Sequence, residues 1–145
     1  MKELDENKAL ARRFLEEVVN EGNQALADEL VAEDFVDHNP LPGLPPGKEG
    51  FIQSFGVFRA AFPDLAYAIQ DLIGEDDKVV VRWTATGTHR GELMGIPPTE
   101  TRIATTGVDI FRVADGKLAE LWLSWDQLGM MEQLGVVSLP GPPSG

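Results

Sequence analysis

The chain has 145 residues, enough for one domain with a buried core. It carries 12 Lys and Arg against 24 Asp and Glu, a net charge of −12, which argues against binding to nucleic-acid phosphates or anionic membranes. Cysteine is absent, which excludes disulfides and thiolate metal ligands. No apolar run approaches the roughly 18 residues of a membrane span. The first residues lack the pattern of a signal peptide, so we expect a cytoplasmic protein.

The first half of the chain has the apolar spacing of helices. The pattern predicts one helix over residues 4–19, ended by a glycine in the segment 20–23, and a second, shorter helix over residues 25–31. A loop follows over residues 41–47, which hold three prolines and two glycines. A third helix is predicted from Lys48 to Phe62, and its phenylalanines are expected in the core, where they can also form one wall of a cavity.

From residue 65 the apolar period changes to two, which is typical of strands. Strands are predicted over 65–73, 78–89, 101–113 and 117–125, with a tight hairpin turn at Asp115-Gly116 and a short helix over 127–134. Helices followed by an antiparallel sheet indicate an α+β fold. We expect one domain over residues 1–137, followed by a disordered tail over the Pro- and Gly-rich residues 138–145.

Both faces of the predicted sheet carry apolar side chains. On one predicted strand, Phe111 and Val113 fall on one side and Val108 and Ile110 on the other. On the next strand, Trp122 falls on the side opposite to Leu121 and Leu123. One face must pack against the helices, and the other would leave an apolar patch in water. A homodimer packed sheet to sheet is the simplest expectation.

Several motifs in the second half of the chain occur in the order found in a known family. The chain resembles the SnoaL-like polyketide cyclases, also called ester cyclases, of the nuclear transport factor two superfamily, from about residue 5 to residue 136. The motifs are Gly87-Thr88-His89-Arg90-Gly91-Glu92-Leu93-Met94-Gly95-Ile96-Pro97-Pro98-Thr99, Gly107-Val108-Asp109-Ile110-Phe111-Arg112, Asp115-Gly116-Lys117-Leu118, Trp122, Asp126 and Gln133-Leu134-Gly135.

The resemblance implies a cone-shaped, curved antiparallel sheet closed by N-terminal helices, and a homodimer. It also implies ring closure by intramolecular aldol condensation, or a related isomerisation, with a carboxylate as acid and base in an apolar pocket. No metal or other cofactor takes part in such a reaction. The expected substrate is a small apolar or aromatic carbonyl compound.

The chain departs from the cyclase pattern at the catalytic carboxylate. In the cyclases this group lies on the last long strand, at the position of Leu123 here, and a polar partner on the preceding strand falls at Asp109. A carboxylate is therefore retained on a different strand. An Asp in an apolar pocket suits a general base, because desolvation raises its pKa toward neutral pH. Asp109 is thus either the pocket base or a buried partner of Arg82 or Arg102.

Two histidines and a second aspartate are further candidates. His38, where the second helix leads into the proline-rich loop, either contributes a titrating group to the rim of the cavity or braces the loop. His89 ends a strand, and Asp126 is either a pocket residue or the N-cap of the last helix. No metal-ligand spacing connects these residues. The predicted substrate contacts are His89 and Asp126 together with Trp83, Leu123, Trp125, Phe58 and Tyr67.

Two other functions remain open. A hydrolase of the limonene epoxide hydrolase kind would use an Asp-Arg-Asp relay, with the Arg two residues before the strand Asp, but Gly107 occupies that position. A non-catalytic binding or dimerisation module is supported by Leu123 in place of the cyclase carboxylate.

Overall fold

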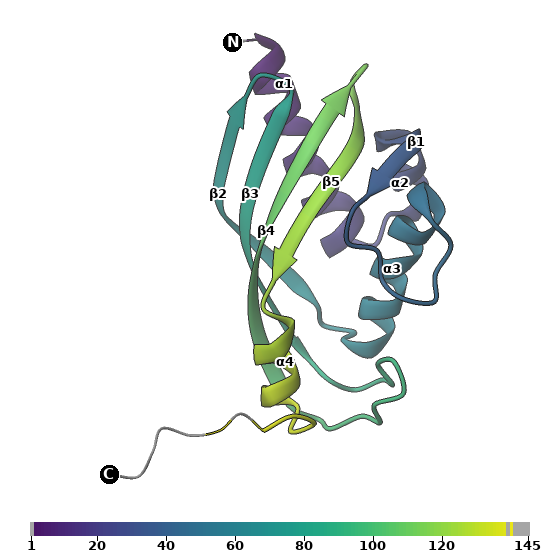
Figure 1. Cartoon of the computed structure of the whole chain (residues 1–145), viewed down its shortest axis with the longest axis vertical. Coiled ribbons are helices and arrows are strands. Elements are labelled where there is room, and N and C mark those ends of the chain that lie inside the picture. Colours follow the sequence, from purple (N-terminus) through teal and green to yellow (C-terminus); the bar gives the residue numbers. More distant parts are fainter. Residues whose placement is uncertain (1, 139, 141–145) are drawn as a thin grey trace.

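The computed structural model of the chain describes residues 2–138 and 140 and confirms the α+β fold (Figure 1). Its first elements are helix α1 (Lys2–Arg13), the π-helix η1 (Phe14–Asn20), helix α2 (Gln24–Leu30), strand β1 (Val31–Asp37) and helix α3 (Gly47–Ala61). Strands β2 (Ala66–Glu75), β3 (Lys78–Thr88), β4 (Arg102–Ala114) and β5 (Lys117–Trp125) follow, and helix α4 (Gln127–Gln133) comes last. Of the tail predicted to be disordered, residues 139 and 141–145 lie outside the described residues.

The strands form one sheet in the order β1-β5-β4-β3-β2. The four predicted strands are present and pair in antiparallel fashion, β2 with β3, β3 with β4 and β4 with β5, whereas β1 is a strand that has no counterpart among the predicted elements. It pairs in parallel with β5, and it begins at Val31, which was predicted to be helical. Its pairing partner lies more than 80 residues away, and Glu33 and Asp34 interrupt its apolar pattern, so local periodicity gave no strand signal there.

The helices pack against one face of the sheet, which we call the inner face. Figure 1 shows the long strands β3 and β4 bending, with α1 and α3 on the same side of them. Register shifts between Ile69 and Asp71 of β2, and at Arg112 on the β4–β5 pair, are irregularities that increase local twist and bending. The curved sheet and the helices therefore enclose a space between them and do not pack as two flat layers.

Aromatic rings connect the helices to the sheet. Phe14 of η1 stacks on Phe51 of α3 with ring centroids 5.4 Å apart and meets Phe111 of β4 edge-on at 6.2 Å. Phe51 also stacks on Phe35 of β1 at 4.5 Å. This cluster closes one end of the enclosed space. Farther along α3, Phe58 is only partly buried, because it faces the space that remains.

Side chains alternate strictly between the two faces of the sheet. In β3 and β4 the odd-numbered residues are buried on the inner face, and the even-numbered ones lie on the opposite, outer face. The outer face carries half-buried apolar side chains beside charged ones; the apolar ones are Val80, Val108, Ile110 and Trp122.

Candidate functional site

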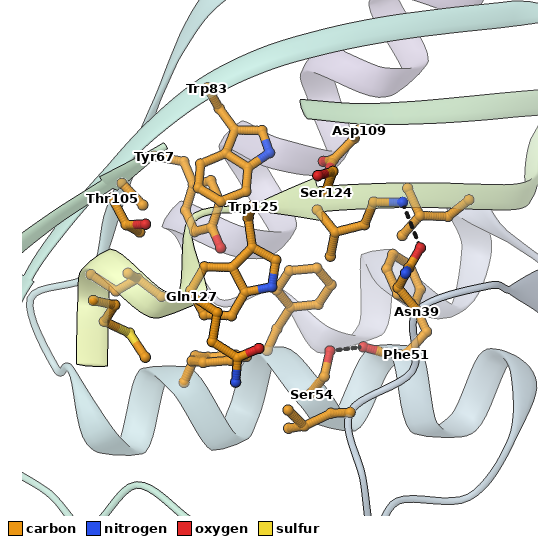
Figure 2. A pocket seen from close by; sticks show the side chains of 18 of the residues that line it. Asn39, Phe51, Ser54, Tyr67, Trp83, Thr105, Asp109, Ser124, Trp125 and Gln127 are labelled. Carbon is orange, nitrogen blue, oxygen red and sulfur yellow. Dashed lines mark hydrogen bonds between the residues drawn. The ribbon is translucent and has the colours of Figure 1, made fainter. Parts of the chain in front are cut away.

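A pocket of about 520 Å³ lies between the inner face of the sheet and the helices η1 and α3 (Figure 2). Its volume is in the range of sites for small organic molecules. Aromatic and aliphatic side chains make up most of its wall. The polar lining side chains are Asp37, Asn39, Ser54, Tyr67, Thr105, Asp109, Ser124 and Gln127.

Two rows of inner-face residues run across β3, β4 and β5, and Trp83, Asp109, Leu123 and Trp125 from these rows line the pocket. One row is Trp83, Gly107 and Trp125, and the next is Val81, Asp109 and Leu123. Gly107 is needed in the first row, because a Cβ atom there would come within 2.3 Å of Cζ2 of the Trp83 ring. The absence of a side chain at this position lets the indole lie across β4 beside Asp109.

Asp109 is a buried carboxyl without a charged partner among the described residues. Its exposed fraction is 7%, and no Lys or Arg of the part of the chain that the structure describes forms a salt bridge with it. Burial, together with the nearby charge of Asp37, raises the pKa of Asp109 to about 7. The Trp83 indole N–H faces the carboxyl and partly offsets this rise, although its geometry falls outside that of a regular hydrogen bond (Figure 2).

The predicted alternative for Asp109, an ion pair with Arg82 or Arg102, is wrong. Arg82 lies on the outer face, where its Nε is 2.6 Å from Oδ2 of Asp71. Arg102 is an exposed, even-numbered residue of β4, so its side chain leaves the strand on the side opposite to that of Asp109. The buried carboxyl therefore lacks the compensation that a structural ion pair would give it.

A second carboxyl in the pocket, Asp37, was not identified from the sequence. It ends β1, two residues after the buried Phe35, and lies on the same side of the strand. Burial raises the pKa of Asp37 above its usual range, and the Asn39 backbone N–H, 2.9 Å from Oδ1, and the neighbouring His38 lower it in part. The alternation from Phe35 to Asp37 was the signal that could have revealed this residue, once β1 was recognised as a strand.

Tyr67 of β2 brings a hydroxyl into the same pocket. Its ring lies 4.7 Å from that of Trp83, between centroids. Burial, and then the nearby Asp109, raises the pKa of Tyr67, so its hydroxyl keeps its proton and can donate a hydrogen bond. Among the predicted contact residues, Trp83, Leu123, Trp125, Phe58 and Tyr67 all line the pocket.

His38 does not line the pocket. Its ring stacks on Trp122 with centroids 5.0 Å apart, and its Nε2 lies 2.6 Å from Oε2 of Glu120. Because side chains alternate along β1, Asp37 faces inward and the next residue faces outward. The predicted position of His38 at the rim of the cavity is therefore corrected: it lies on the outer face of the sheet.

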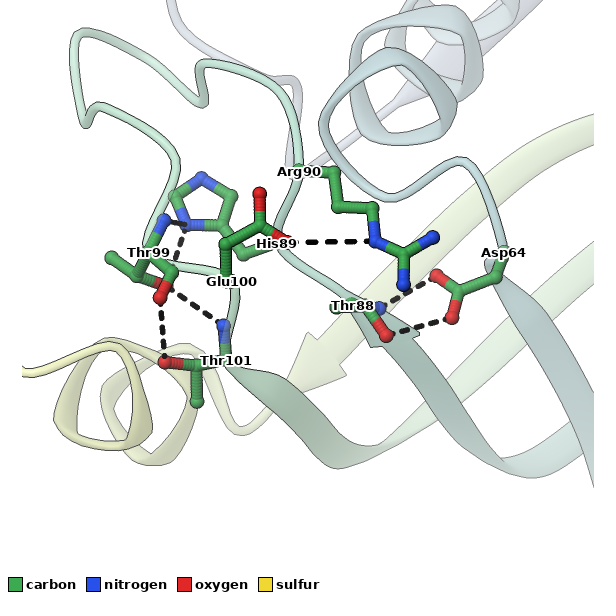
Figure 3. Close-up of polar contacts among 7 residues, drawn as sticks. All are labelled: Asp64, Thr88, His89, Arg90, Thr99, Glu100 and Thr101. Atoms are coloured by element: carbon green, nitrogen blue, oxygen red, sulfur yellow. Dashed lines mark hydrogen bonds and ion pairs between the residues drawn. The ribbon is translucent and has the colours of Figure 1, made fainter.

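His89 and Asp126 also lie outside the pocket lining. His89 is fully buried beside Phe62, and its Nδ1 accepts a hydrogen bond from the Thr99 backbone N–H at 3.2 Å (Figure 3). Asp126 accepts a hydrogen bond from the Gly129 N–H at 2.9 Å, so it is the N-cap of α4, the alternative that the sequence also allowed. Both residues lie at the end of the sheet where β3 leads into the β3–β4 connection and β5 leads into α4.

The connection between β3 and β4 is held at its base by side chains. Asp64 accepts hydrogen bonds from the backbone N–H and the hydroxyl of Thr88, at 2.6 and 2.8 Å. Arg90 and Glu100 form an ion pair at 3.6 Å across the two ends of the loop (Figure 3). The loop places Met94 against the pocket, so these contacts position one part of its wall.

The described residues include no group of three or more His, Cys, Asp or Glu side chains arranged to hold a metal ion. No helix in the described part of the chain is both long and apolar enough to cross a membrane.

Comparison with known proteins gives consistent matches over most of the chain. The profile of the SnoaL-like polyketide cyclase family matches residues 9–134. Nogalonic acid methyl ester cyclase of Streptomyces nogalater is 32% identical over 119 residues, covering 80% of this chain and 88% of the relative. The structure of TsrD from Streptomyces laurentii is 31% identical with a TM-score of 0.82, covering 92% of this chain and 97% of that chain. IdmH from Streptomyces antibioticus is 34% identical with a TM-score of 0.77, covering 90% and 99%.

Proposed function

Because the chain belongs to the SnoaL-like polyketide cyclase family, we propose that it catalyses proton transfer on a carbonyl compound without a cofactor. The reaction is an aldol-type ring closure or an isomerisation, and Asp109 takes part in it as an acid or base. The observation that carries this proposal is a buried carboxyl, with a pKa of about 7, facing a largely apolar pocket in which the described lining residues include no cation to pair with it. Such a group holds comparable amounts of its acid and base forms at neutral pH.

The chemistry explains why burial helps. A C–H bond next to a carbonyl is a weak acid, so a base must lie within hydrogen-bond reach of the carbon. The enolate that forms needs a donor near its oxygen, and the protonated Tyr67 and Asp109 side chains are available in this pocket. Aromatic side chains of Trp83, Trp125 and Phe58 line the pocket and lower its local polarity, which strengthens each of these interactions.

The charge of the pocket favours a neutral substrate. Among the described residues that line it there is no Lys, Arg or His, whereas two are aspartates. A free carboxylate on the substrate would be repelled, and an ester or ketone would not. The curated relative of Streptomyces nogalater is named for a methyl ester. We therefore place this chain's substrate among neutral aromatic polyketide esters.

Turnover of nogalonic acid methyl ester by the natural protein and by Asp109→Asn tests the proposal. The variant should lose about 10²-fold or more in kcat/KM, the range of general acid-base catalysis. Asp71→Asn is the matched control, because it removes an exposed carboxylate from the outer face and should keep nearly full activity. Full activity in Asp109→Asn would contradict the role of Asp109.

A non-catalytic binding module is the second candidate, favoured by Leu123 in the pocket where the cyclases have a carboxylate. In that case the ester would bind to the natural protein without being converted, and Asp109→Asn would bind it at least as well. The epoxide hydrolase alternative has less support, because the position two residues before Asp109 is Gly107, whose Cβ side is filled by the Trp83 ring.

We further propose a homodimer formed by the outer face of the sheet. Half-buried apolar residues gather there, among them Ile110 and Trp122. Pairing two outer faces would remove these residues from water.

A further inference from the structure

We propose that Asp37 is a second catalytic residue, the base that takes the proton from carbon, while protonated Asp109 donates a hydrogen bond to the carbonyl oxygen of the same substrate. This inference rests on the proposed function and divides its two proton-handling roles between two carboxyls.

The sheet places these carboxyls on opposite sides of one strand. Asp37 of β1 is paired with Leu121 of β5, and Asp109 of β4 is paired with Leu123 of β5. Asp37 and Asp109 are therefore offset by two strand spacings of about 4.8 Å and by two residues of about 3.3 Å along the strand, which gives roughly 12 Å between their Cα atoms. Both side chains line the one pocket, with Leu121 and Leu123 between them as an apolar floor. A carbonyl group and its neighbouring carbon therefore fit between the two carboxyls.

The surroundings of the two carboxyls differ in a way that assigns the roles. Asp109 is nearly fully buried, between Val81 and Leu123 in its row. Asp37 is half-buried, accepts the Asn39 N–H at 2.9 Å and lies next to His38. When two carboxyls influence each other, the less stabilised one keeps its proton. Asp37 is thus the carboxylate of the pair, and Asp109 is the acid.

Few other titratable groups face the pair. β2 contributes Tyr67, which keeps its proton, and β3 contributes the neutral Trp83 N–H. The pocket-lining residues of η1, α3 and α4 carry no charge; they are Leu15, Phe51, Ser54, Phe55, Phe58, Gln127 and Met130. His38, on the outer face, is the charged neighbour of Asp37 outside the pocket. Inside the pocket the pH dependence therefore belongs to Asp37 and Asp109.

The reaction that follows is balanced in protons and electrons. The C–H bond next to the carbonyl breaks, its proton moves to Asp37, and its electron pair becomes the enolate, whose oxygen accepts the Asp109 hydrogen bond. In a ring closure the enolate carbon forms a C–C bond to a second carbonyl carbon, and the electron pair of that C–O π bond moves to its oxygen. That oxygen takes the proton held by Asp37. In an isomerisation the proton returns to a different carbon. Asp109 keeps its own proton throughout.

The first test measures kcat/KM against pH, with nogalonic acid methyl ester as the substrate. Activity of the natural protein should fall as pH rises through about 7, because Asp109 loses its proton there. A rate that instead rises through about 7 would show that Asp109 acts as the base, and would overturn the assignment. Asp37→Asn should lose about 10²-fold or more in kcat/KM.

The control is Asp34→Asn, which removes an exposed carboxylate from the same strand, outside the pocket lining, and should leave kcat/KM nearly unchanged. Near-natural activity in Asp37→Asn with an inactive Asp109→Asn would overturn this inference and leave the proposed function standing. No turnover by the natural protein would overturn both. A thermal melt checks that each variant is folded, and Asp37→Ser replaces Asp37→Asn if the latter is not.

The second test needs no substrate. Carboxyl NMR titration of the Asp109 side chain should show its pKa falling by about one unit in Asp37→Asn, because a charge roughly 12 Å away at an effective dielectric constant of about 20 contributes an effect of that order. In Asp34→Asn the pKa of Asp109 should stay where it is. An unchanged pKa in Asp37→Asn would show that the two carboxyls do not influence each other, and the division of roles would then fail.

Discussion

Replacing Asp109 by Asn removes a carboxyl whose ionisation opposes folding, so its effect on stability should depend on pH. The pKa of Asp109 is about 7 in the folded protein, against 3.8 for an ordinary Asp. Between these two values the folded chain holds a proton that the unfolded chain has released. The stability of the natural protein therefore falls as pH rises from about 4 to about 7, and the loss is constant above that range.

The size of the effect follows from the shift. One pKa unit corresponds to about 1.4 kcal/mol, so a shift of about three units amounts to about 4 kcal/mol at pH 8, and to only about 0.5 kcal/mol at pH 4. Asp109→Asn keeps the shape of the side chain and cannot ionise. Its free energy of unfolding should exceed that of the natural protein by these amounts, which at pH 8 corresponds to a melting temperature roughly 8–16 °C higher.

Urea unfolding of both proteins at pH 4 and pH 8 measures this difference. Asp71→Asn is the control, because it breaks an exposed ion pair with Arg82 and should cost no more than about 1 kcal/mol. A variant that is less stable than the natural protein at pH 8 would refute the reasoning, since it would mean that the Asp109 charge has a stabilising partner. An equal difference at both pH values would show that the carboxyl titrates normally.

Two further predictions concern the sheet. Gly107→Ala should lower the free energy of unfolding by about 1–3 kcal/mol, because the new Cβ overlaps the Trp83 ring. Gly56→Ala on α3, where a new Cβ has no atom within contact distance, should raise it by about 0.5–1 kcal/mol. Equal urea midpoints for the two variants would contradict this prediction. Light scattering at micromolar concentration should give twice the chain mass of 15.8 kDa for the natural protein. Trp122→Glu, which puts a charge on the outer face, should give a single chain mass. A monomeric natural protein would rule out the proposed dimer.

The elements with strong local patterns could be predicted from the sequence. The helices and the four strands from residue 65 onward were found because their apolar periods and turn residues are local signals. β1 was not found, because its partner β5 is distant along the chain and an edge strand needs few apolar residues. Without that strand, the sequence does not show which of residues 37–39 point into the pocket. His38 was therefore predicted as a catalytic residue, and Asp37 was not.

The alternation of side chains along a strand explains why the predicted pairing of Asp109 with Arg102 is absent. Arg102 and Asp109 are seven residues apart on one strand, so they lie on opposite faces, and the ion pair that the sequence left open cannot form. The placement of Asp109 against Trp83 depends on the register of β3 with β4 and on the missing side chain at Gly107. No local pattern encodes that register.

The contact between Trp83 and Gly107 also restricts how this protein can diversify. A side chain larger than hydrogen at position 107 overlaps the indole that lies across it and lowers stability, and a smaller residue at position 83 would leave an unfilled space beside Asp109. Each single replacement is therefore harmful, whereas an exchange at both positions can keep the volume filled. The two sites should show strong epistasis, so a library that aims to reshape this pocket must vary them together.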